Sequence, residues 1–132
     1  MQSSSKVIFV SGGASGLGRA TVKHMLSLNF RVAAADLSTE NLSQLKLEAN
    51  TPNLITFQCD VTVESNVKEA VEATVLKWNK IDVCVTCAGI LMPMLTLTSK
   101  TSLNAEKFKK ILDVNVMGSI YVAKYVSIEM AK

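Results

Sequence analysis

Residues 6–18 read KVIFVSGGASGLG, an apolar run that leads directly into a turn rich in glycine. The run at residues 6–11 has the length and composition of a short buried β-strand. Glycines in the turn allow positive φ angles, close approach of the backbone to a ligand, and tight packing of a following helix on the strand. We expect that helix over residues 17–28, where Val22, Met25 and Leu26 share one face.

The same order of strand and helix recurs along the chain. Further strands are expected at residues 31–35, 53–58 and 81–86, each followed by a segment of helical period. Ser38, Thr62 and Asn104 are candidate caps for the later helices, the last of which extends to residue 132. The alternation predicts an α/β fold, a doubly wound parallel sheet of the Rossmann type. As one domain over residues 1–132, it would stop after four strands in the order 3-2-1-4 and leave the fourth strand as an unpaired edge.

Composition supports a folded domain and excludes several classes. Of 132 residues, 48% are hydrophobic and 19% charged, which argues against disorder. A net charge of +3 without a basic cluster gives little support to binding of nucleic acid or a membrane surface. The longest apolar stretch, residues 83–97, is too short to span a membrane, and the start MQSSSK lacks the apolar part of a secretion signal. The three cysteines are expected to be free thiols in a reducing compartment.

The glycine turn is a candidate phosphate-binding loop, although an ordinary turn would have the same composition. The helix that follows offers free N–H groups and a positive dipole end to a pyrophosphate. Asp36 ends the second strand, 18 residues after Gly18. Its carboxylate can accept hydrogen bonds from the hydroxyls of an adenosine ribose and would repel a 2′-phosphate; a solvated strand end or helix cap is the alternative interpretation. Because Leu37 follows it, and not arginine, NAD is favoured over NADP as the cofactor.

Other chemically suggestive residues have simpler explanations. Cys84 and Cys87 form a C-x-x-C, but on a strand this odd offset sends the side chains to opposite faces, so no metal site is expected. His24, the single histidine, is interpreted as a partly exposed surface residue. Asn115 lies on the apolar stripe of the last helix and is expected to be buried there; a core asparagine with satisfied hydrogen bonds is the alternative to a functional role.

The detailed spacing of the glycines is GxxxGxG, and three later segments extend the pattern. Ser11 precedes the first glycine; the family named below has threonine there, which also carries a hydroxyl group. The later segments are Asp60-Val61, Thr86-Cys87-Ala88-Gly89, and Val114-Asn115-Val116 with Gly118. In this order they resemble the short-chain dehydrogenase/reductase family, whose fourth-strand turn reads N-N-A-G. The stretches GGASGLGRAT, IDVCVTCAGI and ILDVNVMGS are most similar to members that act on 3-hydroxyacyl-CoA or 17β-hydroxysteroids.

The resemblance implies roles for individual residues. Ser15 and Leu17 would contact the pyrophosphate and ribose mainly through their backbone, and Asp60 and Val61 would flank the adenine. Asn115 would be the catalytic residue, bending its helix and holding through its carbonyl a water of a proton relay. The full cofactor-binding set implied is Gly12, Ser15, Gly16, Leu17, Gly18, Asp36, Asp60, Val61, Cys87, Ala88 and Gly89.

The implied activity is NAD-dependent oxidation of a secondary alcohol, such as a 3-hydroxyacyl-CoA or 17β-hydroxysteroid, to the ketone. The family's serine and Tyr-x-x-x-Lys pair are missing: Tyr121 and Lys124 are one residue too close, and Tyr121 and Tyr125 are interpreted as surface or subunit contacts. The chain is therefore expected to be the cofactor-binding half, inactive alone. The resemblance also implies an acyl-CoA or steroid as substrate, a homotetramer in the full-length form, and a mitochondrial location, with the cytoplasm as alternative.

Two other functions stay open at this point. One is a non-catalytic dinucleotide-binding or interaction module. The other is a carbonyl reductase or sugar-alcohol dehydrogenase of the same superfamily.

Overall fold

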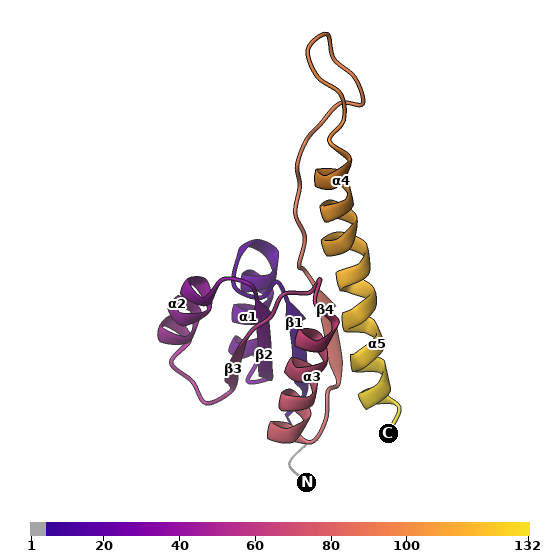
Figure 1. Cartoon of the computed structure of the whole chain (residues 1–132). Coiled ribbons are helices and arrows are strands. Elements are labelled where there is room, and N and C mark those ends of the chain that lie inside the picture. The colour runs from indigo at the N-terminus through magenta and orange to yellow at the C-terminus, as the bar shows by residue number, and fades with distance from the viewer. Residues whose placement is uncertain (1–4) are drawn as a thin grey trace.

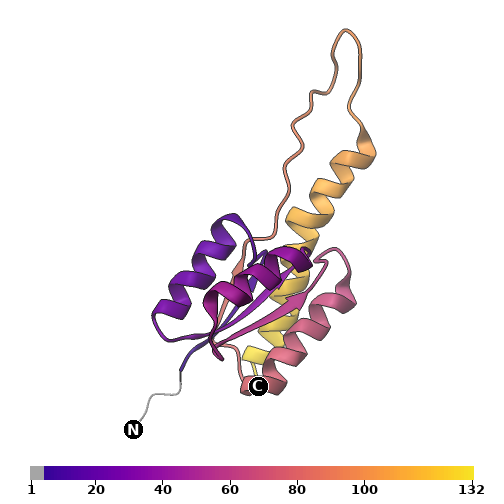
Figure 2. The same ribbon diagram turned by 90° about the vertical axis from the view of Figure 1, so that its left-hand side faces the viewer.

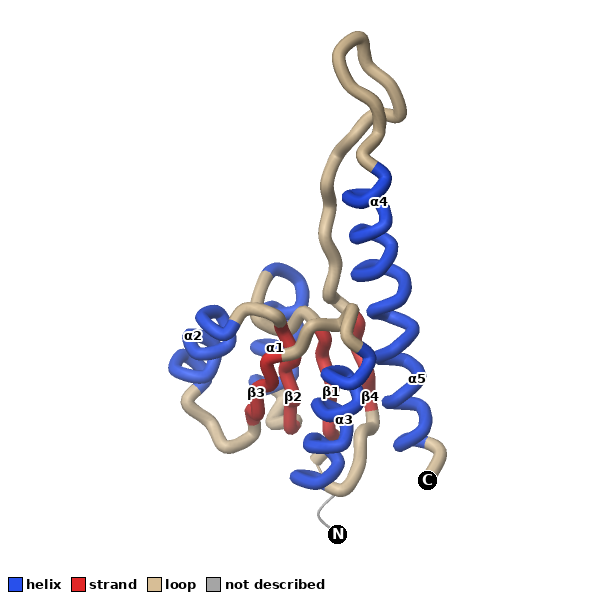
Figure 3. Tube along the Cα trace, viewed as in Figure 1, coloured by secondary structure: helices blue, strands red, loops and turns tan. Residues whose placement is uncertain are grey.

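A computed structural model describes residues 5–132 and places four parallel strands in one sheet, in the order β3-β2-β1-β4 (Figures 1 and 3). The strands are β1 (Val7–Ser11), β2 (Arg31–Asp36), β3 (Leu54–Gln58) and β4 (Val83–Thr86). The predicted fold class, strand order and open edge at β4 are confirmed. Residues 1–4, which contributed to the expectation about secretion, lie outside the described residues.

Helices cover both faces of the sheet (Figure 2). On one face lie α1 (Gly16–Ser27) and α2 (Thr39–Ala49). On the other lie α3 (Glu64–Trp78) and the last helix, which runs as α4 (Ala105–Leu112), a π-helical segment η1 (Asp113–Gly118) and α5 (Ser119–Met130).

Strand β1 is buried on both faces because its side chains alternate between the two helix layers. Ile8 and Val10 pack against α1 and α2, whereas Val7 and Phe9 pack against α3 and α5. The apolar run recognised in the sequence is thus the central strand, and the glycine turn leaves its carboxyl end.

Two of the three predicted helix caps are confirmed. The Ser38 side chain accepts a hydrogen bond from the Asn41 N–H, and Asn104 accepts one from the Lys107 N–H. The prediction for Thr62 is wrong. Its hydroxyl donates to Asp60 Oδ1 at 2.7 Å, and Val63 occupies the cap position of α3 without a capping side chain. Thr62 stands one residue before the cap position, and its hydroxyl is oriented toward the Asp60 carboxylate.

The cysteines lie as the strand geometry predicted. Cys84 packs with the α3 and α5 layer and Cys87 with the α1 and α2 layer, and all three cysteines are free. Burial raises the pKa of the Cys59 and Cys84 thiols to about 11, so both stay protonated at neutral pH. His24 is exposed, as expected.

The predicted apolar stripe of the last helix is only partly buried. Val122 and Val126 are in the core, but Phe108 and Leu112 are 46% and 43% exposed, and Asn115 is exposed rather than buried. The π-helical turn inserts an extra residue and shifts the phase between the two halves of the helix. In addition, α4 and the loop before it project past the carboxyl ends of the strands (Figures 1 and 2).

By length and composition, the continuous helix Ala105–Met130 is apolar enough to cross a membrane, a test that core helices of non-membrane proteins also pass. The expectation of no membrane span considered only the longest unbroken apolar stretch. In this helix the charged residues Asp113 and Lys124 interrupt the apolar residues, so a search for unbroken apolar stretches does not find the helix.

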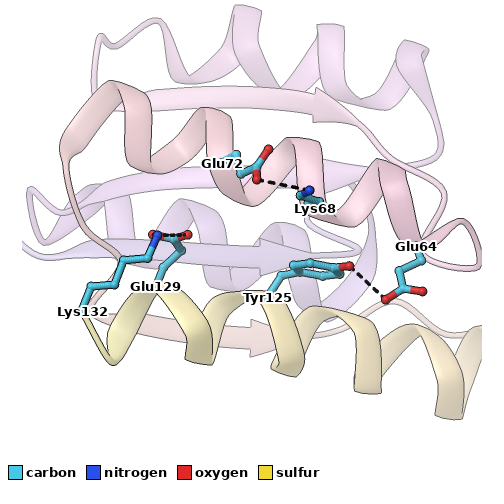
Figure 4. A network of polar contacts seen from close by, with 6 residues as sticks. All are labelled: Glu64, Lys68, Glu72, Tyr125, Glu129 and Lys132. Carbon is cyan, nitrogen blue, oxygen red and sulfur yellow. Dashed lines mark hydrogen bonds and ion pairs between the residues drawn. The ribbon is translucent and has the colours of Figure 1, made fainter.

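Glu64, at the start of α3, joins that helix to α5. Its Oε1 accepts hydrogen bonds from Lys124 Nζ at 2.7 Å and from the Tyr125 hydroxyl at 3.0 Å, the second of which Figure 4 shows. Tyr121 and Tyr125 are half-buried and pack against the core, so they are not simply surface residues. Their interpretation as subunit contacts stays a prediction.

We expect this contact to make stability depend on acid. Hydrogen bonds from Lys124 and then Tyr125 lower the pKa of Glu64. Such a carboxyl stabilises the fold fully above its unfolded pKa of about 4.3, and the contribution is lost as pH falls through the lower folded pKa. Glu64→Gln should therefore flatten the fall in thermal midpoint below about pH 4.3, measured by circular dichroism. Glu72→Gln, at a surface pair with Lys68 (Figure 4), is the matched control and should keep the parent profile.

Candidate functional site

The glycine turn folds back tightly between β1 and α1. Gly12 and Gly16 have φ angles of 66° and 52°, a region that side chains with a Cβ disfavour. A Cβ on Gly12 would lie 2.5 Å from the backbone nitrogen of Ala88, and one on Gly18 would overlap the carbonyl oxygen of Gly12. The two glycines thus bring α1, the turn and the chain after β4 into backbone contact.

The start of α1 faces the turn with its N–H groups. Ser15 is the cap residue in extended conformation, and its side chain makes no capping hydrogen bond. The first turn carries no acidic residue. The dipole and unpaired donors at this end are therefore available to an anion. Leu17, in the same turn of helix, is 83% exposed.

Asp36 connects the glycine turn to the segment after β2. Its Oδ2 accepts a hydrogen bond from the Ala14 N–H at 3.0 Å, and its Oδ1 accepts one from the Ser38 N–H at 3.0 Å. Each carboxylate oxygen can accept two hydrogen bonds, so both retain capacity for a ligand hydroxyl. The carboxylate is half-buried and lies at the carboxyl end of its strand.

Asp60 organises the segment after β3. Its Oδ1 accepts hydrogen bonds from the N–H and the hydroxyl of Thr62 at 2.9 and 2.7 Å, and its own N–H donates to Asn66 Oδ1. Val61, held between these anchored residues, is 7% exposed and packs in the core with Val122. This turn is therefore rigid on both sides of Val61.

Asn115 holds the segment after β4. Its Oδ1 accepts a hydrogen bond from the Ile90 N–H at 2.8 Å, and its Nδ2 donates to the Ile90 carbonyl at 2.9 Å. Its own carbonyl accepts a hydrogen bond from the Ser119 hydroxyl. The side chain is exposed, yet both halves of its amide are hydrogen-bonded, because they pair with the N–H and the carbonyl of one residue, Ile90. It lies in η1, and π-helical turns are places where helices kink.

These segments meet in one cleft of about 640 Å³ at the carboxyl edge of the sheet. Eight of the predicted residues line it: Gly12, Ser15, Asp36, Asp60, Val61, Cys87, Ala88 and Gly89. Four predicted residues do not line the cleft: Gly16, Leu17, Gly18 and Asn115. Gly18 lies under the turn, and Asn115 acts through Ile90, which does line the cleft. The assigned roles of these residues stay predictions.

Part of the cleft wall was missed from the sequence. Lys110, Asp113 and Val114 line it from the last helix. Their spacing of i, i+3 and i+4 places them on one helix face, and this periodicity is the signal that could have revealed them. Asp113 also pairs with Lys109 at 2.7 Å. Over residues 5–132, no group of three His, Cys, Asp or Glu side chains is placed to hold a metal ion.

The sheet order, the glycine turn and the acid at the end of β2 define a dinucleotide-binding α/β domain. The family model described as short chain dehydrogenase matches residues 6–132. The chain belongs to the short-chain dehydrogenase family, a family of oxidoreductases, and the resemblance inferred from its motifs is confirmed.

Individual relatives are similar over most of this chain. It is 35% identical over 124 residues to short chain aldehyde dehydrogenase 1 of Euphorbia lathyris, covering 91% of this chain and 41% of that protein. It is 34% identical over 129 residues to 3-hydroxyacyl-CoA dehydrogenase type-2 of Homo sapiens, covering 96% and 49%. The chain therefore spans about half the length of these curated relatives.

Solved structures agree on the fold. The crystal structure of gox2181 superposes with a TM-score of 0.85 at 25% identity, covering 97% of this chain and 49% of that one. The 3-ketoacyl-(acyl-carrier-protein) reductase from Brucella melitensis, solved in complex with NADH, gives a TM-score of 0.83 at 23% identity, covering 94% and 50%.

Proposed function

We propose that the chain is the NAD-binding half of a dehydrogenase that oxidises a secondary alcohol to a ketone. The observation that carries this proposal is the Asp36 carboxylate, tied at 3.0 Å to the glycine turn and bordering the cleft. In the bound state, N–H groups of the turn and of α1 face the pyrophosphate. Asp36 accepts from the adenosine ribose, and Asp60 and Val61 flank the adenine. The main chain at residues 87–89 approaches the nicotinamide, which supplies the hydride acceptor.

The tyrosine that would carry the acid–base chemistry of the family is not part of the cleft wall. No tyrosine lines the cleft within residues 5–132, and Lys124 and Tyr125 are engaged by Glu64 at the start of α3. The 132-residue chain is therefore proposed to bind cofactor without turning over substrate. Fluorescence titration should therefore show that NADH binds to the chain. Assays with NAD and secondary alcohols should show no hydride transfer.

We expect NADH to bind more tightly than NADPH by at least about tenfold, because a carboxylate repels a 2′-phosphate. Leu37, 64% exposed on the cleft wall, offers no positive charge. Arg19 and Lys23 of α1 are both paired with Glu48 at 2.7 Å, and these pairs lower the pKa of Glu48 to about 2. Titration with both cofactors measures the ratio of the two affinities. Leu37→Arg should reduce this ratio, because arginine adds a positive charge beside the proposed ribose site. Equal or tighter binding of NADPH would contradict the assignment.

The substrate class is proposed to be an apolar secondary alcohol, with a 3-hydroxyacyl-CoA favoured and a 17β-hydroxysteroid as the alternative. The similarity to the human 3-hydroxyacyl-CoA dehydrogenase supports this. So does an apolar wall at Leu91 and Met92, which is shared by the cleft and by a second hollow of about 440 Å³ further along the loop. Lys107 borders that second hollow. A homotetramer and a mitochondrial location, the latter with the cytoplasm as alternative, complete the proposal by resemblance.

A further inference from the structure

We propose that Gly118 is a positioning residue that sets the width of the cleft at its Asp60–Val61 wall. The inference rests on the proposed dinucleotide binding, because that wall is the one assigned to the adenine. Gly118 itself does not line the cleft. It acts through Val61, which does.

Backbone conformation does not explain a glycine at this position. Gly118 has φ −58° and ψ −44°, ordinary right-handed helical values that alanine adopts readily. Glycine in a helix interior is less favourable than alanine because it has more conformational freedom to lose. Gly118 is also buried, so no exposed ligand contact requires it.

Steric contact with Val61 does explain it. A Cβ on Gly118 would lie 2.6 Å from Val61 Cγ2, closer than real Cβ contacts come, and 3.0 Å from Val61 Cβ, a tight contact that requires a neighbour to give way slightly. Valine is branched at Cβ, so rotating χ1 moves Cγ2 but leaves Cβ in place. An added methyl group must therefore reorient or displace the Val61 side chain, or shift the helix that carries residue 118.

The contacts around Val61 and Gly118 direct this displacement toward the cleft. On the helix side, Asn115 lies in the same π-helical segment and is held to Ile90 by two hydrogen bonds of 2.8 and 2.9 Å. On the strand side, the Cys59 N–H donates to the Asp36 carbonyl at 2.9 Å, and Asp60 is bonded to Thr62. Because the helix is held through Asn115 and the backbone on both sides of Val61 is anchored, the added atom displaces the Val61 side chain, which borders both the core and the cleft.

The test is a double-mutant cycle on the full chain with NADH and with ADP-ribose, which lacks the nicotinamide. Gly118→Ala should weaken the binding of both ligands by about tenfold, which corresponds to about 1.4 kcal/mol. Val61→Ala removes the clashing methyl group. In that background Gly118→Ala should change either affinity by less than about twofold. A loss of affinity that persists in the Val61→Ala background would overturn the proposal.

Controls separate this inference from folding and from the proposed function. Ala123→Ser adds one atom to an exposed position of the same helix and should leave both affinities unchanged. If Gly118→Ala does not fold, the Val61→Ala/Gly118→Ala double variant should; a double variant that also fails to fold counts against the contact. A parent chain that binds neither ligand overturns the proposed function, whereas a parent that binds and a Gly118→Ala variant that binds equally well overturn only this inference.

Discussion

Gly18→Ala should destabilise the chain by at least about 3 kcal/mol, the range of severe overpacking in a core. Alanine ordinarily stabilises a helix relative to glycine, and Gly18 lies in the first turn of α1. Here the added methyl group would overlap the carbonyl oxygen of Gly12, which is a backbone atom. No rotamer relieves that overlap. Gly12 cannot retreat either, because it already lies against the backbone of Cys87 and Ala88.

Gly16→Ala is the matched control, and urea denaturation of both variants is the measurement. A Cβ on Gly16 would meet no atom within 4 Å, but its φ of 52° is unfavourable for alanine. That substitution should cost only about 1–2 kcal/mol. Together the two variants separate steric overlap from backbone strain. If Gly18→Ala were no more destabilising than Gly16→Ala, the close packing of α1 on the turn would be wrong.

Asp36→Ala should reduce both stability and cofactor affinity. Without the carboxylate, the N–H groups of Ala14 and Ser38 lose their acceptor. Leaving a buried donor unpaired costs about 1–3 kcal/mol, and these half-buried donors should fall near the lower end. NAD affinity should fall by a further 1.5–3 kcal/mol or so, the worth of hydrogen bonds to a charged group, which corresponds to about a ten- to hundredfold change in Kd.

Calorimetric titration with NAD measures the affinity of Asp36→Ala, and Asp36→Asn and Leu37→Ala are the comparison variants. Asparagine keeps the size and one acceptor oxygen, so it should retain more stability than alanine while losing the charge. Leu37→Ala changes the neighbouring wall residue without touching the hydrogen bonds of Asp36 and should leave stability close to the parent. An Asp36→Ala chain that is less stable yet binds NAD as tightly as the parent would show that the carboxylate supports the turn without contacting the ribose.

The elements of this fold were predictable because each has a local signal. The apolar run before Gly12 can only be a buried strand, and Asp36 marks the end of the next one. The hydrogen bonds of Asp36 were not predictable, because Ala14 is 22 residues away and meets it only after the sheet forms. The capping prediction for Thr62 failed for a local reason: α3 has Val63 at its cap position, and the Thr62 hydroxyl is bound by Asp60 two residues earlier.

The last helix shows where periodicity fails. A stripe counted at a uniform 3.6 residues per turn placed Asn115 in the core, but the π-helical turn around it breaks that count. Nothing in the local sequence marks a π-helical turn as clearly as glycine marks the turn at residues 12–18. The contact between Gly118 and Val61 joins two segments whose sequences show no relation.

The path of the last helix has a practical meaning for protein engineering. It starts beyond the carboxyl ends of the strands and carries the chain back to their amino ends beside β4, as Figure 1 shows. A parallel strand fused after α5 would need only a short connector and a right-handed crossover to pair with β4. The open edge at β4 also makes the domain a candidate for fragment complementation, in which a separately expressed polypeptide that begins with a β-strand is supplied in trans.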